Sequence, residues 1–328
     1  MISRVAEHAF WLNRYLERVD NLARMLFVNT GFVLDVDLEG VPRWMPLVVV
    51  VGEEERFRAT HPKSKLDDGD AVQDFLVWNL DNPSSIASSI RVARENARSI
   101  REVISLEMWE TLNGLWLWIE SAQAKRLFQN KRYDFYRHIR DQCVLVQGFG
   151  LDTMLQNEAY NFMRLGAALE RGAQTARILD VKFHALGPTG QGLETPNEAA
   201  QWMAILRSCS AIEPFFKTSG GDLSGPMVAG FLLFDRFFPR SVLRSLERSW
   251  NFMKLIRPSS KHPTGANSAQ QLKSLLDEVK ALEVDKVVAE GLHQRLTWIV
   301  DSLADVCETI YHDFFAVPEQ EKPGRRRK

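Results

Sequence analysis

The stretch Tyr15-Leu16-Glu17-Arg18-Val19-Asp20-Asn21-Leu22-Ala23-Arg24-Met25-Leu26 decides how the rest of the chain is interpreted. It returns in imperfect form as Ala168-Leu169-Glu170-Arg171-Gly172-Ala173-Gln174-Thr175-Ala176-Arg177-Ile178-Leu179. Both copies contain Leu-Glu-Arg followed by Ala-Arg-x-Leu. A repeated unit usually indicates that its copies pack on each other or line a shared surface. The repeat therefore predicts a fold organised around two related helices.

Apolar residues around the first copy follow the period of an α-helix. From Val5 to Leu26 they recur at alternating steps of four and three, which gives one continuous stripe. Similar spacing runs from Ile90 to Ile119 and again from Val288 to Phe314. The sequence has no alternation of strands with helices and no series of hairpins. It therefore predicts an all-α protein, an elongated helical bundle in which the two Leu-Glu-Arg helices pack together.

Capping and turn residues predict where some helices begin and break. Asn82-Pro83 is expected to start a long helix, with Asn as N-cap and Pro at the first helical position, and this helix could break near Asn113-Gly114. The segment from Ser268 to Gln271 is expected to cap another helix. Residues 35–81 are irregular, and the run from Val48 to Val51 could be a buried strand or the end of a helix.

Length and composition limit the class of protein. The chain has 328 residues, of which 45% are hydrophobic, enough to build a substantial core. We expect a single helical domain over residues 1–318, which could divide into halves 1–150 and 151–318. Residues 319–328 are expected to form a disordered basic tail.

Charge and hydropathy argue against two kinds of partner. The formal net charge of -1 gives no strong field for nucleic acid, so we expect no nucleic-acid partner. No apolar run approaches the roughly 20 residues of a membrane helix, and the first residues do not resemble a signal peptide. We expect a cytoplasmic protein without membrane contact. The cysteines agree, because Cys143, Cys209 and Cys307 are widely spaced in apolar sequence, as is typical of buried thiols in a reducing compartment.

Helical geometry separates the two charges of the first motif. At 100° per residue, Glu17 and Arg24 project on one line beside the apolar stripe. Asn13 and Asp20 lie between them, whereas Arg18 points away. The seven residues from Glu17 to Arg24 correspond to a rise of roughly 10 Å, too far for an ion pair within one helix. Each charge therefore needs a partner elsewhere.

The second copy has the same geometry, with Gly166 and Ala173 in place of the intervening polar residues. These small residues would permit close approach of two helices. We expect the copies to pack antiparallel about a pseudo-twofold axis, so that the Glu of each copy meets the more distant Arg of the other. The expected ion pairs are Glu17 with Arg177 and Glu170 with Arg24.

Two interpretations of these charges stay open. A half-buried salt-bridge network would fix the register of the helices. A carboxylate and guanidinium site would instead bind a polar ligand. The candidate polar site consists of Glu17, Arg24, Glu170, Arg177, Asp20 and Asn13.

Metal and nucleophilic chemistry have little support in the sequence. Glu290-Gly291-Leu292-His293 has the Glu-x-x-His form of di-iron bundles, and Glu308 with His312 adds a second acid and imidazole pair. However, Glu290, Glu308 and His312 lie opposite the apolar stripe, and Glu-x-x-His does not recur. We therefore expect no metal site and no cofactor. No histidine has a Cys or Ser at a recognisable catalytic spacing, so no catalytic residue is predicted.

The chain resembles the bacterial alpha-E proteins, which are named for a helical domain with a recurring Glu-Arg motif. The matching segments are Ser3-Arg4-Val5-Ala6-Glu7, Arg14-Tyr15-Leu16-Glu17-Arg18, Asp81-Asn82-Pro83-Ser84-Ser85-Ile86, Ala93-Arg94-Glu95-Asn96-Ala97-Arg98, Met108-Trp109-Glu110-Thr111-Leu112-Asn113, Leu169-Glu170-Arg171 and Phe238-Pro239-Arg240-Ser241-Val242. The chain departs from the family pattern at Gly172 to Thr175 and over residues 35–70. Only its Glu-Arg positions match the motif for which the family is named, and no catalytic residue can be transferred.

The resemblance implies an all-helical protein encoded beside, or fused to, an atypical ATP-grasp protein. It also implies transglutaminase-like proteases and a proteasome-like peptidase nearby, in a system that makes or modifies a peptide. We therefore expect a non-catalytic helical partner or scaffold of an ATP-grasp peptide ligase. The expected partners are the ATP-grasp protein and a transglutaminase-like protein.

The alternative is an enzyme or ligand-binding protein that uses the Glu-Arg pairs on an anionic or peptide substrate. Glu17 or Glu170 would then act as general acid or base, and Arg24 and Arg177 would hold the substrate. A solvent-reachable pocket that contains both pairs would favour this alternative. A dry network together with an exposed apolar patch would favour the scaffold.

Overall fold

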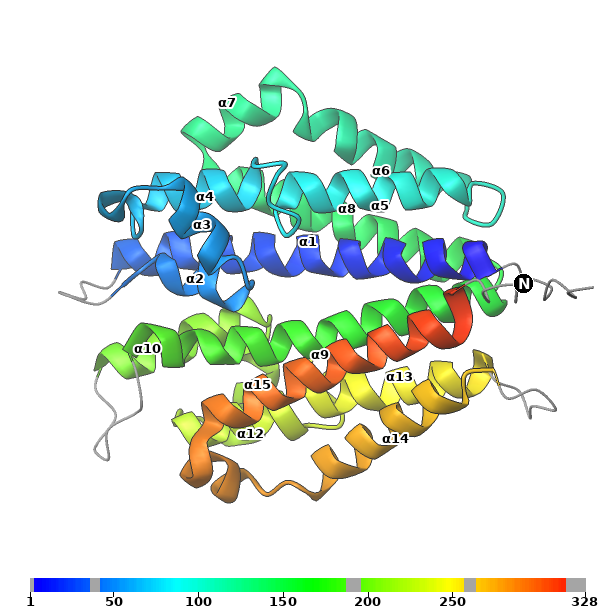
Figure 1. The fold of residues 1–328 in the computed structure, drawn as a ribbon. Coiled ribbons are helices and arrows are strands. Elements are labelled where there is room, and N and C mark those ends of the chain that lie inside the picture. Colours follow the sequence, from blue (N-terminus) through cyan, green and yellow to red (C-terminus); the bar gives the residue numbers. More distant parts are fainter. Residues whose placement is uncertain (1–2, 36–41, 187–195, 257–263, 317–328) are drawn as a thin grey trace, which may run out of the picture.

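A computed structural model describes residues 3–35, 42–186, 196–256 and 264–316. Every regular element in these ranges is helical, and the helices form an elongated bundle (Figure 1). The predicted all-α fold is therefore confirmed. No helix in the described ranges is long and apolar enough to cross a membrane.

The two Leu-Glu-Arg helices lie side by side in the middle of the bundle (Figure 1). The first copy lies in α1 (Ser3–Asp35) and the second in α9 (Glu158–Leu186). The apolar stripe of each helix packs into the core, where Leu16 and Leu165 are fully buried. The prediction that these helices pack together is thus confirmed.

The two central helices are parallel, so the predicted antiparallel packing is wrong. Near the beginning of both helices Gly166 packs against the backbone of Phe10, and near their ends Met25 and Ile178 line the same pocket. The chain between them folds back along the bundle before α9 begins, which brings α9 into the direction of α1 (Figure 1). The predicted close approach does occur at Gly166, where a Cβ atom would overlap the Phe10 carbonyl oxygen.

Each central helix is flanked by two long helices of its own half of the chain. Helices α5 (Ile86–Ser99) and α8 (Arg132–Thr153) pack on α1. Helices α13 (Val242–Ile256) and α15 (Val284–Ile310) pack on α9. This arrangement places the Glu-Arg motifs at the interface between the halves.

The remaining helices cover the outside and ends of this framework. In the first half they are α2 (Met45–Val50), α3 (Glu54–Thr60), the 3₁₀-helix η1 (Lys63–Lys65), α4 (Gly69–Val77), α6 (Leu106–Ile119) and α7 (Ala122–Asn130). In the second half they are α10 (Pro196–Ser208), α11 (Ile212–Ser219), α12 (Gly225–Phe234), α14 (Ala266–Ala281) and the π-helix η2 (Tyr311–Phe315).

Two predicted features of the long helix after Asn82-Pro83 are wrong. The N-cap of α5 is Ser85, whose Oγ accepts a hydrogen bond from the backbone N of Ser88 at 3.2 Å. The break between α5 and α6 falls at residues 100–105 and leaves Asn113-Gly114 inside α6. In both places a Ser with extended backbone conformation, Ser85 or Ser105, caps the next helix. A Ser cap stabilises a helix start, and these caps therefore set the observed boundaries.

Other boundaries also differ from the prediction. Ser268 lies inside α14, so the predicted cap at Ser268 to Gln271 is wrong. Most of the run from Val48 to Val51 lies in α2, which settles it as the end of a helix. The domain end at 318 and the tail 319–328 lie outside the described residues.

A candidate polar site between the two Glu-Arg helices

The Glu of each motif binds the adjacent Arg of the other motif. Arg171 donates from Nε and Nη2 to the Oε1 and Oε2 atoms of Glu17, at 2.8 and 2.7 Å. Arg18 donates from Nε and Nη2 to the same two oxygens of Glu170, at 3.0 and 3.3 Å. Both contacts are bidentate, which is the strongest geometry for a guanidinium and a carboxylate. The parallel helices bring the motifs level, so the pairs cross between α1 and α9 reciprocally.

The predicted pairs Glu17 with Arg177 and Glu170 with Arg24 are wrong, although the two motifs do pair reciprocally. Arg24 binds Asp20 on its own helix, with 2.8 Å from Nη2 to either carboxylate oxygen, and its Nη1 donates to Ser210 Oγ. Arg177 donates from Nη1 to the backbone carbonyl of Val50 at 2.9 Å. Among the described residues it forms no ion pair with a carboxylate at salt-bridge distance.

The error has a physical cause in the length of the arginine side chain. The helical wheel places each side chain on the line of its Cα atom, but an arginine can fold its aliphatic stem along the helix surface. The guanidinium of Arg18 lies 5.2 Å from the ring centre of Tyr15 and reaches α9 from the flank of α1. The direction of a residue on the helical wheel is therefore not sufficient to predict which arginine binds Glu170.

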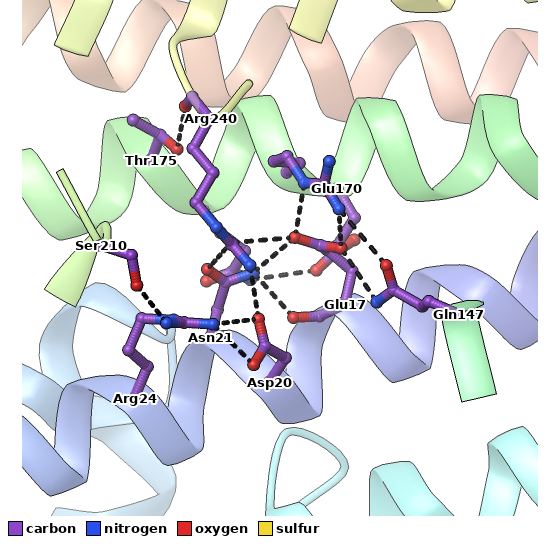
Figure 2. A network of polar contacts seen from close by, with 11 residues as sticks. Glu17, Asp20, Asn21, Arg24, Gln147, Glu170, Thr175, Ser210 and Arg240 are labelled. Carbon is purple, nitrogen blue, oxygen red and sulfur yellow. Dashed lines mark hydrogen bonds and ion pairs between the residues drawn. The ribbon is translucent and has the colours of Figure 1, made fainter. Parts of the chain in front are cut away.

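Glu17 lies at the centre of a buried cluster that also includes Arg240. Arg240 precedes α13 and reaches toward α1 (Figure 2), where its Nη1 donates to Glu17 Oε1 at 3.1 Å and to Asn21 Oδ1 at 3.0 Å. Its Nη2 donates to Asp20 Oδ2 at 2.6 Å. Gln147 of α8 closes the cluster with a 3.3 Å hydrogen bond from Nε2 to Glu17 Oε2. The side chain of Glu17 is fully buried.

Electrostatics keep both carboxylates of this cluster ionised. Burial alone would raise the pKa of Glu17, but the charges of Arg171 and Arg240 outweigh it and lower that pKa to about 2. Burial also opposes ionisation of Asp20, and the charges of Arg240 and Arg24 lower its pKa below the ordinary value. Neither group can exchange a proton readily at neutral pH.

Glu170 forms a second cluster with two arginines of α1. Arg14 donates from Nε and Nη2 to Glu170 Oε2 at 3.0 and 2.8 Å, in addition to the contact from Arg18. Gln174 Nε2 donates to Glu170 Oε1 at 3.0 Å. Burial would raise the pKa of Glu170, but the charges of Arg18 and Arg14 hold it well below its usual range.

The second cluster borders a larger cavity than the first, whose Arg171 lines a pocket of only about 10 Å³. A pocket of about 150 Å³ lies between α1, α9 and α15, and its lining includes Arg14, Arg18, Glu170 and Arg177. The Glu17 cluster does not line this pocket. The structure thus brings Glu17 and Asp20 into one buried network, and it separates them from Arg177, which lies beside the cavity.

Two arginines that bind the motif carboxylates were not predicted from the sequence. They are Arg14, which binds Glu170, and Arg240, which binds Glu17. Arg240 lies between Pro239 and the Ser241 cap of α13. These residues mark the start of a helix, but they do not indicate that Arg240 reaches Glu17. Asn13 is buried in α1, and its Oδ1 has no hydrogen-bond partner among the described residues.

The motifs considered for metal binding do not converge in the described residues. No group of three or more His, Cys, Asp or Glu side chains there could hold a metal ion. His293 Nδ1 lies 2.8 Å from Asp180 Oδ1, and His312 and Glu308 are exposed, with 4.0 Å between their nearest atoms. The side chain of Glu290 lies outside the described part.

Comparison with known proteins identifies a family and a set of longer relatives. Residues 1–315 match the model of the Alpha-E family, described as a predicted α-helical domain with a conserved ER motif. Uncharacterized proteins of Mycobacterium bovis and of two Mycobacterium tuberculosis strains are 23% identical to the chain over 350 residues. The match covers 98% of this chain but only 38% of each relative. No solved structure matches the chain significantly.

Proposed function

The chain belongs to the Alpha-E family, and from that premise we propose that it is a non-catalytic helical partner or scaffold of an ATP-grasp peptide ligase. The observation that carries the proposal is the state of the two motif carboxylates. Glu17 and Glu170 are each buried and bound by two arginines. A general acid or base must exchange a proton near the working pH, and the low pKa of both groups opposes that role. In this proposal the motif holds the halves of the bundle in register.

An exposed apolar stripe on α8 supports a docking role. Val144 and Leu151 are seven residues apart and project on one line of the helix, with relative exposures of 59% and 47%. Gly148 lies between them, and Leu155, which is 80% exposed, lies two residues after the end of the helix. Exposed apolar side chains that gather on one face, and are not scattered singly, typically mark a site of protein contact. In this proposal the stripe receives the ATP-grasp protein.

The length of the relatives also supports a partnership. The chain spans about two fifths of the mycobacterial proteins that it matches. In those proteins the region similar to this chain is therefore part of a larger polypeptide. Such an arrangement is expected of a helical unit that works beside other domains, including the ATP-grasp and transglutaminase-like partners of this proposal.

The experiment is co-purification with the neighbouring ATP-grasp protein, followed by ATP turnover on candidate peptides. We expect the helical protein to bind the ligase and to raise its turnover. Leu151→Asp should weaken binding at least about tenfold, since a charge would be buried in an apolar contact. The matched control is Leu255→Asp, because Leu255 is 59% exposed on α13, away from the stripe.

The same assay tests the non-catalytic role. Glu17→Gln, measured under conditions where it is folded, should still bind the ligase and support turnover. A ligase that works equally well alone would overturn the partnership. A folded and ligase-bound Glu17→Gln protein without turnover would overturn the structural role of the motif.

A further inference from the structure

The two Glu-Arg clusters are related position by position along α1 and α9. Asn21 donates to Glu17 Oε1 at 3.2 Å, and Gln174, at the matching position of α9, donates to Glu170 Oε1 at 3.0 Å. Arg24 and Arg177 also occupy matching positions, seven residues after their Glu. The same framework is therefore built twice.

The helices that flank the clusters begin in the same way. Pro239-Arg240-Ser241-Val242 begins α13, and Pro83-Ser84-Ser85-Ile86 begins α5. Ser241 Oγ accepts a hydrogen bond from the backbone N of the residue three positions later, at 3.1 Å, and Ser85 does the same at 3.2 Å. Arg240 in the first cluster therefore corresponds to Ser84 in the second.

Two departures from this correspondence remove side chains from the second cluster. Asp20, which binds both Arg24 and Arg240, corresponds to Ala173. The second departure replaces Arg240 with Ser84. An aspartate and an arginine of the first cluster thus have small counterparts in the second.

The pocket of about 150 Å³ lies where these two side chains are missing. Ser84, Ala173 and Arg177 all line it. Arg177 has no counterpart of the carboxylate that holds Arg24. Its Nη1 binds Val50, and its Nε and Nη2 have no hydrogen-bond partner among the described residues. The pocket therefore contains Arg177, the counterpart of Arg24, but no counterpart of the Asp20 carboxylate that binds Arg24.

The charge around the pocket is unbalanced. Among the described residues that line it, three are arginines and one, Glu170, is acidic. Burial lowers the pKa of Arg177. The charges of Glu170 and Asp301 oppose this effect, while those of Arg18 and Arg14 add to it. A guanidinium nevertheless stays charged in proteins, so an anion beside Arg177 would relieve both its desolvation and its repulsion by Arg14 and Arg18.

We propose that this pocket binds a carboxylate, which takes the place that the Asp20 carboxylate has in the first cluster and pairs with Arg177. Val51, Val300 and Leu303 line the same pocket, so the ligand is a small carboxylic acid with a short apolar substituent. A free acid and the C-terminal residue of a peptide share this chemistry. The proposal stands on the pocket and does not depend on a ligase partner.

The test measures binding of three probes by calorimetry and by thermal shift. The probes are butyrate, an acetylated dipeptide that ends in valine, and the same dipeptide with an amidated C-terminus, each against chloride at equal ionic strength. We expect saturable binding of butyrate, of the free dipeptide or of both, and none of the amide. Butyrate alone would identify a free acid, and the dipeptide alone a peptide end.

Variants of Arg177 and Ala173 separate a binding role from a structural one. Arg177→Gln should weaken carboxylate binding at least about tenfold, the usual loss when a charge-assisted pair is removed. Ala173→Asp should abolish binding and raise the melting temperature, because it restores the internal carboxylate that Asp20 provides to Arg24. Ala173→Asn, which has nearly the same size without the charge, should give no such gain in stability.

Three results would overturn the proposal. One is the absence of saturable carboxylate binding to the wild-type protein. Another is binding of the amidated dipeptide as tightly as the free one, because the carboxylate would then be irrelevant. Unchanged affinity in a folded Arg177→Gln protein would show that the ligand, if any, binds elsewhere.

Discussion

Replacing Glu17 by glutamine should destabilise the protein by about 3 kcal/mol at neutral pH. The substitution keeps the shape of the side chain but removes the charge that holds Arg171 and Arg240. A fall in the pKa of Glu17 from 4.5 to about 2 corresponds to roughly 3 kcal/mol, since one pKa unit is worth about 1.4 kcal/mol. Removing one partner of a buried ion pair typically costs about 3–5 kcal/mol, in agreement with that value.

The assay is unfolding by urea, followed by circular dichroism and tryptophan fluorescence. The matched control is Glu95→Gln, because Glu95 is 42% exposed while it pairs with Arg94 and Arg98. An exposed pair contributes at most about 1 kcal/mol, so the control should unfold close to the wild type. A loss below about 1 kcal/mol for Glu17→Gln would refute the reasoning, since the buried pair would then be no stronger than the surface pair.

Two more predictions concern acid stability and the contact between the central helices. Glu17 and Glu170 have lower pKa values in the folded than in the unfolded state. Their contribution to the free energy of unfolding is therefore complete above about pH 4.5 and is lost as the pH falls toward about 2. Urea titrations at several pH values should show this decline in stability. A Glu17→Gln, Glu170→Gln double variant should lose less stability over the same pH range, and an equal loss in both proteins would contradict the prediction. Gly166→Ala should cost about 1–3 kcal/mol, because its Cβ would overlap the Phe10 carbonyl oxygen. Gly114→Ala, whose Cβ meets nothing within 4 Å, should instead be neutral or gain up to about 1 kcal/mol in the same unfolding assay, and equal effects would contradict this.

The sequence was sufficient to predict the all-helical fold and the packing of the two motif helices against each other. Leu16 and Leu165 belong to buried faces because a stripe with helical period must pack against another element. Glu17 lies beside this stripe, and the repeat indicated that its partner is on the other copy. Gly166 indicated a close helix contact, since a residue without Cβ is useful where backbones approach.

Other features depend on tertiary structure that no local pattern records. The direction of α9 relative to α1 follows from the path of the intervening chain, which a repeat alone does not specify. The choice of Arg171 over Arg177 as the partner of Glu17 depends on that direction and on the reach of a flexible side chain. Arg240 is far away in sequence, and only the packing of α13 on α9 brings it to Glu17.

The central claim is that the two motifs are held together by crossed pairs between each Glu and the adjacent Arg of the other copy. Double-mutant cycles with Arg→Gln and Glu→Gln substitutions test it most directly. We predict a coupling energy of at least about 1 kcal/mol for Glu17 with Arg171 and for Glu170 with Arg18, and less than about 0.5 kcal/mol for Glu17 with Arg177. Strong coupling of Glu17 to Arg177, with none to Arg171, would contradict the claim.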